Sequence, residues 1–212
     1  MFDATTLLAY TAAATVLVLI PGPGTAWIVA QSVAGGTRRG AQAAVGLETA
    51  TLIHALAAGL GLSAVLATSA LAFEVVKYAG AAYLVWLGIK AWRERDPSPV
   101  QAGPAPAARL PAHHVYLRSV LTGVLNPKVA VFFLAFLPQF VDPARGAVPL
   151  QFLLLGLILS AIGLCNSLAL AWLVGRVGRR MTASPRTMRW KRRITGGVFV
   201  ALGLRLATQA RA

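Results

Sequence analysis

The chain has 212 residues, of which 57% are hydrophobic and 12% are charged. Soluble domains carry about 25% charged residues, and several apolar stretches here approach the roughly 20 residues that a helix needs to cross a bilayer. The composition predicts one all-helical integral membrane domain covering residues 1–212. The net charge of +14 does not indicate a nucleic-acid partner, because most basic residues lie in short segments between apolar stretches.

Six apolar stretches are expected to span the bilayer, in two groups of three. The predicted spans cover residues of about 6–34, 40–67, 71–92, 118–140, 148–174 and 194–207. A linker rich in Pro and Ala, residues 93–117, separates the two groups. Of the 20 Lys and Arg residues, 15 lie in the first, third and fifth connections, which the positive-inside rule assigns to the cytoplasm. Both termini are therefore predicted to lie outside the cytoplasm.

The first predicted span contains a segment that opposes a continuous helix. This segment consists of Pro21, Gly22, Pro23 and Gly24. Proline removes a backbone donor and clashes with the preceding turn, and glycine adds backbone freedom, so the helix is expected to break. A second break is predicted at Asn126 and Pro127, inside the fourth span. Broken helices are tolerated in a bilayer only beside protein or a water-filled cavity, and secondary transporters hold their substrates there.

The two groups of spans predict an internal repeat. Residues 1–92 and 118–212 would each begin with a broken helix, and three spans per repeat give the two repeats opposite orientations in the membrane. The same number of residues separates Pro21 from Gly40 and Pro127 from Gly146. This match is weak evidence for symmetry, because the chain contains 20 glycines.

Three polar residues are predicted to lie at the same depth in the membrane on three different helices. At ~1.5 Å per residue, Glu48, Lys128 and Asn166 each lie roughly 14–15 Å from the nearest basic connection, about half of a ~30 Å hydrocarbon core. An ionisable group at that depth costs about 2.5–3.5 kcal/mol and is usually functional. These residues and the two breaks are therefore predicted to line a transport path. An ion pair of Glu48 with Lys128 that only joins two helices is the alternative.

Other polar residues leave more than one role open. Asn166 would either join helices by hydrogen bonds or contact the substrate. Asn126 would either bind a backbone group freed by Pro127 or contact the substrate. His54 is interpreted as a packing histidine or, together with Glu48, as part of a proton relay, because histidine changes charge near neutral pH.

The motifs Pro21-Gly22-Pro23, Gly46 with His54, and Asn126-Pro127-Lys128 together resemble the LysE/RhtB family of amino-acid exporters. The resemblance covers nearly the whole chain. It implies ion-driven export of amino acids or similar small metabolites across the bacterial cytoplasmic membrane, by two inverted three-helix repeats that pair as a homodimer. This chain departs from the family pattern at Glu48, where an apolar residue is usual, and at Ala50, where a glycine is frequent.

The sequence therefore predicts a secondary transporter that exports amino acids, coupled to the proton gradient and without a cofactor or a metal site. A metal-cation exporter is a weaker alternative, because Glu48 is the only carboxylate predicted at mid-membrane depth. An enzyme is not predicted, since His54 and Ser63 lie about two and a half turns apart and no other catalytic group is evident. A non-transporting membrane adaptor would have little reason to hold charged residues at this depth.

Overall fold

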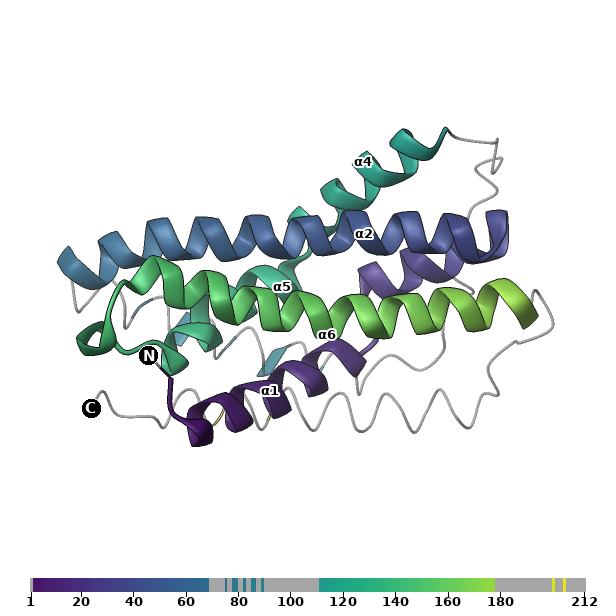
Figure 1. Ribbon diagram of the computed structural model, residues 1–212. Helices are drawn as coiled ribbons and strands as arrows, with labels where there is room; N and C mark the ends of the chain where they lie inside the picture. Colours follow the sequence, from purple (N-terminus) through teal and green to yellow (C-terminus); the bar gives the residue numbers. More distant parts are fainter. Residues whose placement is uncertain are drawn as a thin grey trace.

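In the computed structural model, all elements of the described part of the chain are helical (Figure 1). The structure describes residues 2–68 and 111–177, with isolated positions between 75 and 89 and at 200 and 204. Within them, two helices are long and apolar enough to cross a membrane, or three if one bent pair counts as a single span. The all-helical membrane class is confirmed. The six-span repeat stays a prediction, because the third and sixth spans and most of the linker lie almost entirely outside the described residues.

The first predicted break is present. Helix α1 (Ala4–Leu19) ends two residues before Pro21. Helix α2 (Pro23–Thr68) begins with Pro23, and proline is tolerated at the start of a helix because a backbone N–H there would have no intrahelical acceptor. Inside α2 the backbone leaves the helical conformation at Gly35 and at Gly36, whose φ of 72° favours glycine. This kink divides α2 into two arms, which correspond to the end of the first predicted span and to the second.

The second predicted break is also present. Helix α4 (Ala112–Val124) is followed by α5 (Pro127–Val131), the π-helix η1 (Phe132–Phe136) and the 3-10 helix η2 (Leu137–Phe140), and the axis bends by 47° at the break. The predicted start of this span at residue 118 was too late. The chain is already helical from Ala112, because Val115 is fully buried and packs in a cluster with Leu47 of α2.

The last described helix follows a tight turn. The 3-10 helix η3 (Pro143–Arg145) leads through Gly146, with a φ of 126°, into α6 (Val148–Val177).

Gly40, which lies as far from Pro21 as Gly146 lies from Pro127, is inside α2, where a Cβ would collide with Ser32 and Ala171. The equal spacings from the two prolines therefore lead to different local structures, and the internal repeat stays a prediction.

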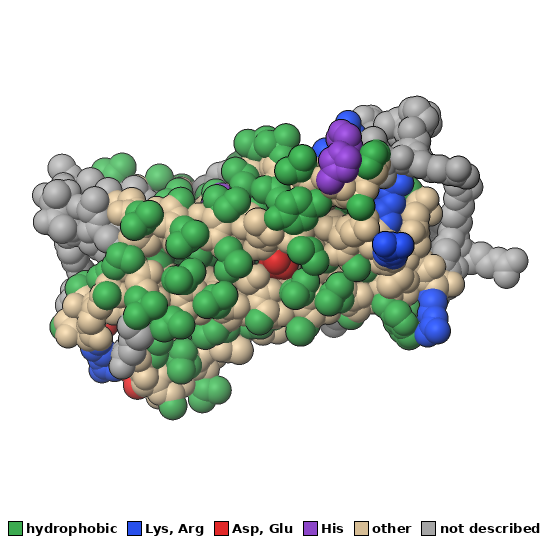
Figure 2. Space-filling view, turned by 45° about the horizontal axis from the view of Figure 1, so that its top comes forward, with side chains coloured by type: hydrophobic (Ala, Val, Ile, Leu, Met, Phe, Trp, Pro, Cys, Tyr) green, Lys and Arg blue, Asp and Glu red, His purple; other side chains and the backbone are tan. Residues whose placement is uncertain are grey.

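Among the described residues, the larger of two buried clusters lies toward one end of the bundle. The large cluster combines α1, η1, η2 and α6 around five fully buried side chains: Tyr10, Phe132, Phe133, Phe136 and Phe152. Toward the other end, a small cluster holds only five buried residues among those described: Ile28, Ala43, Leu47, Val115 and Ala171. The outer face is largely hydrophobic, and most of the visible Lys and Arg side chains gather at one end (Figure 2). Such a surface suits a lipid environment.

Gly156 sets the separation of α2 and α6, which run side by side in Figure 1. A Cβ on Gly156 would collide with the Cβ of the buried Ala55. The substitution Gly156→Ala is therefore expected to destabilise the protein by about 1–3 kcal/mol through overpacking. The measurement is thermal unfolding of the purified protein in detergent. Gly61→Ala, where a Cβ would meet nothing within 4 Å, is the control, and equal melting temperatures for the two variants would contradict the prediction.

Candidate functional site

The two helix breaks lie against each other. Lys128, near the start of α5, extends to the first break, where its Nζ donates a 2.7 Å hydrogen bond to the carbonyl oxygen of Ile20. A Cβ on Gly22 would lie 3.5 Å from Lys128 Cδ, and one on Gly24 would lie 4.0 Å from Asn126 Nδ2. A carbonyl at a helix end lacks its intrahelical donor. Lys128 supplies that donor from the other break.

Asn126 shapes the second break. Its side-chain oxygen accepts a 3.1 Å hydrogen bond from the backbone N–H of Lys128, and Pro127 follows as the first helical residue. This is the local role that the sequence left open for Asn126, since it satisfies a backbone donor at the start of the helix. The side chain is buried, and it also lines the cavity between the breaks.

A cavity of about 90 Å³ lies where the breaks meet. Residues of α1, α2, α4, α5 and α6 line it, together with the two breaks. Its polar side chains are those of Thr25, Glu48, Thr51, Asn126, Lys128, Asn166 and Ser167. The remaining walls are formed by leucine, valine, isoleucine and glycine residues. Glu48, Lys128 and Asn166, which come from three different helices, therefore share one pocket.

Glu48 occupies a space that a glycine leaves open. A Cβ on Gly163 of α6 would lie 2.6 Å from Glu48 Oε1. In the described part of the chain the ion pairs are those of Arg145, so Glu48 and Lys128 do not form the direct ion pair considered as an alternative.

Comparison with known proteins agrees with this arrangement. The model of the LysE type translocator family matches residues 15–210. The chain belongs to the LysE type translocator family. The family membership expected from the sequence motifs is thus confirmed.

This translocator has relatives that match along nearly their whole length. It is 39% identical over 204 residues to an uncharacterized membrane protein of Vibrio cholerae, covering 95% of this chain and 96% of that protein. It is 32% identical over 200 residues to the homoserine/homoserine lactone efflux protein of Salmonella typhi (94% and 95% covered). It is 30% identical over 211 residues to the leucine efflux protein of Klebsiella pneumoniae (98% and 97% covered). No solved structure matches. The family and these relatives indicate a transporter rather than an enzyme.

The structure places the three prolines of the two helix breaks next to the pocket. Pro21, Pro23 and Pro127 are exposed and lie outside its lining, next to the lining residues Gly22 and Lys128. The prolines therefore act by shaping the breaks, while their neighbours face the cavity.

His54 lies beside the pocket but outside its lining. Its Nε2 lies 3.3 Å from the carbonyl oxygen of Gly123, and its ring stacks on Phe133 with centroids 5.9 Å apart. Gly123 lines the pocket, so His54 packs against the outer side of the pocket wall. These contacts describe the packing role that the sequence left open, and a role in a proton relay stays a hypothesis.

The pocket-lining residues that sequence reasoning missed include Thr25, Thr51 and Ser167, which have polar side chains, and Gly163, which leaves space for Glu48. Helical spacing could have found three of them. Thr51 lies one turn after Glu48, Gly163 lies one turn before Asn166, and Ser167 lies one turn after Gly163. Thr25 carries no such signal, because it follows the break.

Metal ligands are scarce in the part of the translocator that the structure describes. There, no three or more His, Cys, Asp and Glu side chains are grouped so that they could hold a metal ion. The pocket contributes a single carboxylate, that of Glu48. The described residues thus offer no ligand set for a metal-cation cargo.

Proposed function

We propose that this translocator exports small amino acids or related metabolites from the cytoplasm in exchange for protons. The observation that carries the proposal is one pocket that holds the ammonium of Lys128, the carboxyl of Glu48 and backbone groups at two helix breaks. An amino-acid zwitterion presents the complementary charges. The names of two relatives, which describe efflux of homoserine and of leucine, support this class of cargo.

Each end of the zwitterion has a candidate partner. Lys128 would bind the carboxylate, and the first turn of α2, where Gly24 and Thr25 line the pocket, would add backbone N–H groups and the positive end of the helix dipole. Glu48 would bind the ammonium group or carry the coupling proton. Asn166 and Ser167 would offer hydrogen bonds to a polar side chain of the substrate.

The size of the pocket favours small amino acids. A water molecule needs about 10–15 Å³ of such volume, so a cavity of about 90 Å³ accepts roughly six to nine non-hydrogen atoms. Homoserine and leucine both fall within this range. Aromatic amino acids exceed it and would require the helices to move apart.

The proposal includes an orientation in the bacterial cytoplasmic membrane. Arg38, Arg39 and Arg176 lie toward one end, because Gly175 of α6 packs against Thr37 at the start of the second arm of α2. Asp3 and Arg145 lie together at the opposite end. We assign the basic end to the cytoplasm by the positive-inside rule, so that both termini lie outside. The homodimer implied by the family resemblance belongs to the same proposal.

Transport can be tested directly in cells that overproduce the protein. Cells preloaded with radiolabelled homoserine or leucine are expected to lose the label faster than cells with an empty vector, and a protonophore is expected to remove the difference. Cells with the Lys128→Gln variant serve as the matched control for overproduction. If no amino acid small enough for the cavity leaves the cells faster, the proposed function is wrong.

A further inference from the structure

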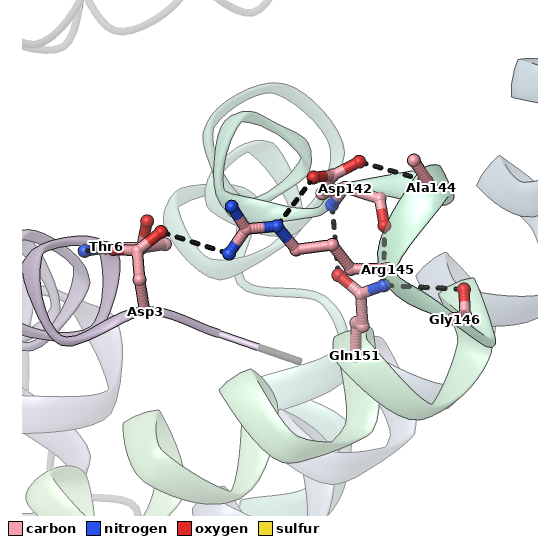
Figure 3. Close-up of polar contacts among 7 residues, drawn as sticks. All are labelled: Asp3, Thr6, Asp142, Ala144, Arg145, Gly146 and Gln151. Atoms are coloured by element: carbon pink, nitrogen blue, oxygen red, sulfur yellow. Dashed lines mark hydrogen bonds and ion pairs between the residues drawn. The ribbon is translucent and has the colours of Figure 1, made fainter.

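A network of polar side chains lies at the end of the bundle opposite Arg38, Arg39 and Arg176, where the start of α1 meets the turn before α6 (Figure 3). The guanidinium of Arg145 lies 3.2 Å from Asp3 Oδ2 and 3.0 Å from Asp142 Oδ2. The Gln151 amide accepts from the Asp142 backbone N–H at 2.9 Å and donates to the Asp142 carbonyl at 2.8 Å. We call Asp3, Asp142, Arg145 and Gln151 the clasp. It joins the start of α1 to the turn before α6.

An aromatic layer lies directly behind the clasp. The ring of Tyr10 contacts those of Phe132 and Phe140, with centroids 6.3 Å and 5.2 Å apart, and Phe136 lies between the other two phenylalanines. The Tyr10 hydroxyl donates a 2.7 Å hydrogen bond to the carbonyl oxygen of Leu155 on α6. This bond joins α1 to α6 at a point where Tyr10 and Leu155 are both fully buried.

The order along two helices places this layer between the clasp and the pocket. On α1 the chain passes from Asp3 in the clasp to Tyr10 in the layer and to Leu17 in the pocket wall. On α6 the same order is repeated by Gln151, Leu155 and Leu159. At ~1.5 Å per residue, the clasp lies roughly 20 Å from the pocket along α1. Along these two helices, a route from the pocket to this end passes the layer.

We infer that the clasp and the aromatic layer form a gate, which seals the pocket from this end and separates during each transport cycle. The inference rests on the proposed function, because a substrate loaded at the basic end must leave past this layer. The clasp is suited to opening, since half-exposed ion pairs contribute only about 0–1 kcal/mol each. The layer includes a π-helix followed by a 3-10 helix, and such irregular turns are frequent at functional sites and hinges.

The carboxylate of Asp3 in the clasp keeps its charge at mildly acidic pH. A hydrogen bond from the Thr6 backbone N–H lowers the pKa of the Asp3 carboxyl, and the nearby Arg145 lowers it further. A lowered pKa means that the carboxylate stabilises the closed gate above its ordinary pKa of 3.8, and that this contribution is lost only as the pH falls through the lowered value. Protons outside the cell therefore do not open the clasp at Asp3.

Cysteine labelling tests the gate without any substrate. The exposed native Cys165 is first replaced by serine, and Ser167→Cys then places a reporter thiol in the pocket wall. Ala147→Cys, at an exposed position next to the clasp, identifies the side of the membrane on which the clasp lies. An impermeant maleimide is added to intact cells or to everted vesicles. The reporter is expected to react slowly from the clasp side and faster from the basic side.

Opening the gate should raise labelling from one side only. Arg145→Gln removes both ion pairs and is expected to speed labelling from the clasp side by roughly 3- to 30-fold. Tyr10→Phe keeps the ring but removes the hydrogen bond to α6, with an expected increase of roughly 2- to 13-fold. Arg118→Gln, an exposed residue of α4 away from the clasp, is the matched control and should change nothing.

Two results would overturn the gate. One is unchanged labelling from the clasp side in both Arg145→Gln and Tyr10→Phe. The other is an equal rise from both sides, which would indicate general loosening of the bundle. Failure of the proposed function would look different, because amino-acid export would be absent while labelling still responded to the gate variants.

Discussion

Replacing Lys128 with glutamine is expected to weaken amino-acid binding roughly 10- to 160-fold. A hydrogen bond to a charged group contributes about 1.5–3 kcal/mol, and glutamine removes the charge that would bind the substrate carboxylate. Glutamine is one bond shorter than lysine, so the 2.7 Å contact of Lys128 with the carbonyl oxygen of Ile20 is expected to weaken as well. The melting temperature of the variant therefore separates an effect on binding from an effect on folding.

The measurement is binding of radiolabelled homoserine and leucine to the purified protein, with the melting temperature recorded for each variant. Arg118→Gln removes a cation of α4 that lies outside the pocket lining, and this variant should bind as the wild type does. Wild-type affinity in Lys128→Gln at an unchanged melting temperature would exclude this lysine from substrate recognition.

Replacing Glu48 with glutamine is expected to lower proton-driven transport by about tenfold or more, since loss of a hydrogen bond to a charged group costs about 1.5–3 kcal/mol. The amide has nearly the same shape as the carboxyl, so it fits the space beside Gly163. It neither takes up a proton nor attracts the ammonium group of a substrate. Transport is measured as uptake into everted vesicles, under an imposed pH gradient and as exchange without a gradient.

The two assays separate the two roles proposed for Glu48. If the residue carries the coupling proton, Glu48→Gln loses gradient-driven uptake and keeps exchange, whereas a partner of the substrate ammonium loses both. Gly163→Ala should weaken transport in the same direction, because its Cβ would displace the carboxyl, with Gly61→Ala as control. Normal uptake in both Glu48→Gln and Gly163→Ala would remove the carboxyl from the mechanism.

The position of the pocket could be predicted to a large extent from local features of the sequence. Pro21 and Pro127 forbid continuous helices, and the structure breaks both helices within two residues of them. Glu48, Lys128 and Asn166 lie at one depth by simple counting, and all three line the cavity. The breaks and the shared cavity could be anticipated because helix breaking and the rise per residue depend on the chain within a few turns of each residue.

The start of α4 shows where a composition signal fails. The high content of Pro and Ala predicted a linker up to residue 117, whereas α4 begins at Ala112. The burial of Val115 against α2 decides that boundary, and composition does not record a contact with a distant helix. The spacing of Gly40 and Gly146 from the two prolines likewise does not reveal their surroundings, because one glycine permits helix contact and the other forms a turn.

The sequence by itself determined a membrane-embedded helical chain, two helix breaks and the polar residues at the depth of those breaks, because hydropathy and helix breaking are local properties. Only the tertiary structure decided which groups meet. Lys128 binds the carbonyl oxygen of Ile20 and does not pair with Glu48. Glu48 lies against Gly163. Arg145 forms an ion pair with Asp3, which is distant from it in the sequence. These contacts join residues separated by many turns, so they depend on how the helices pack and on which small residues allow close approach.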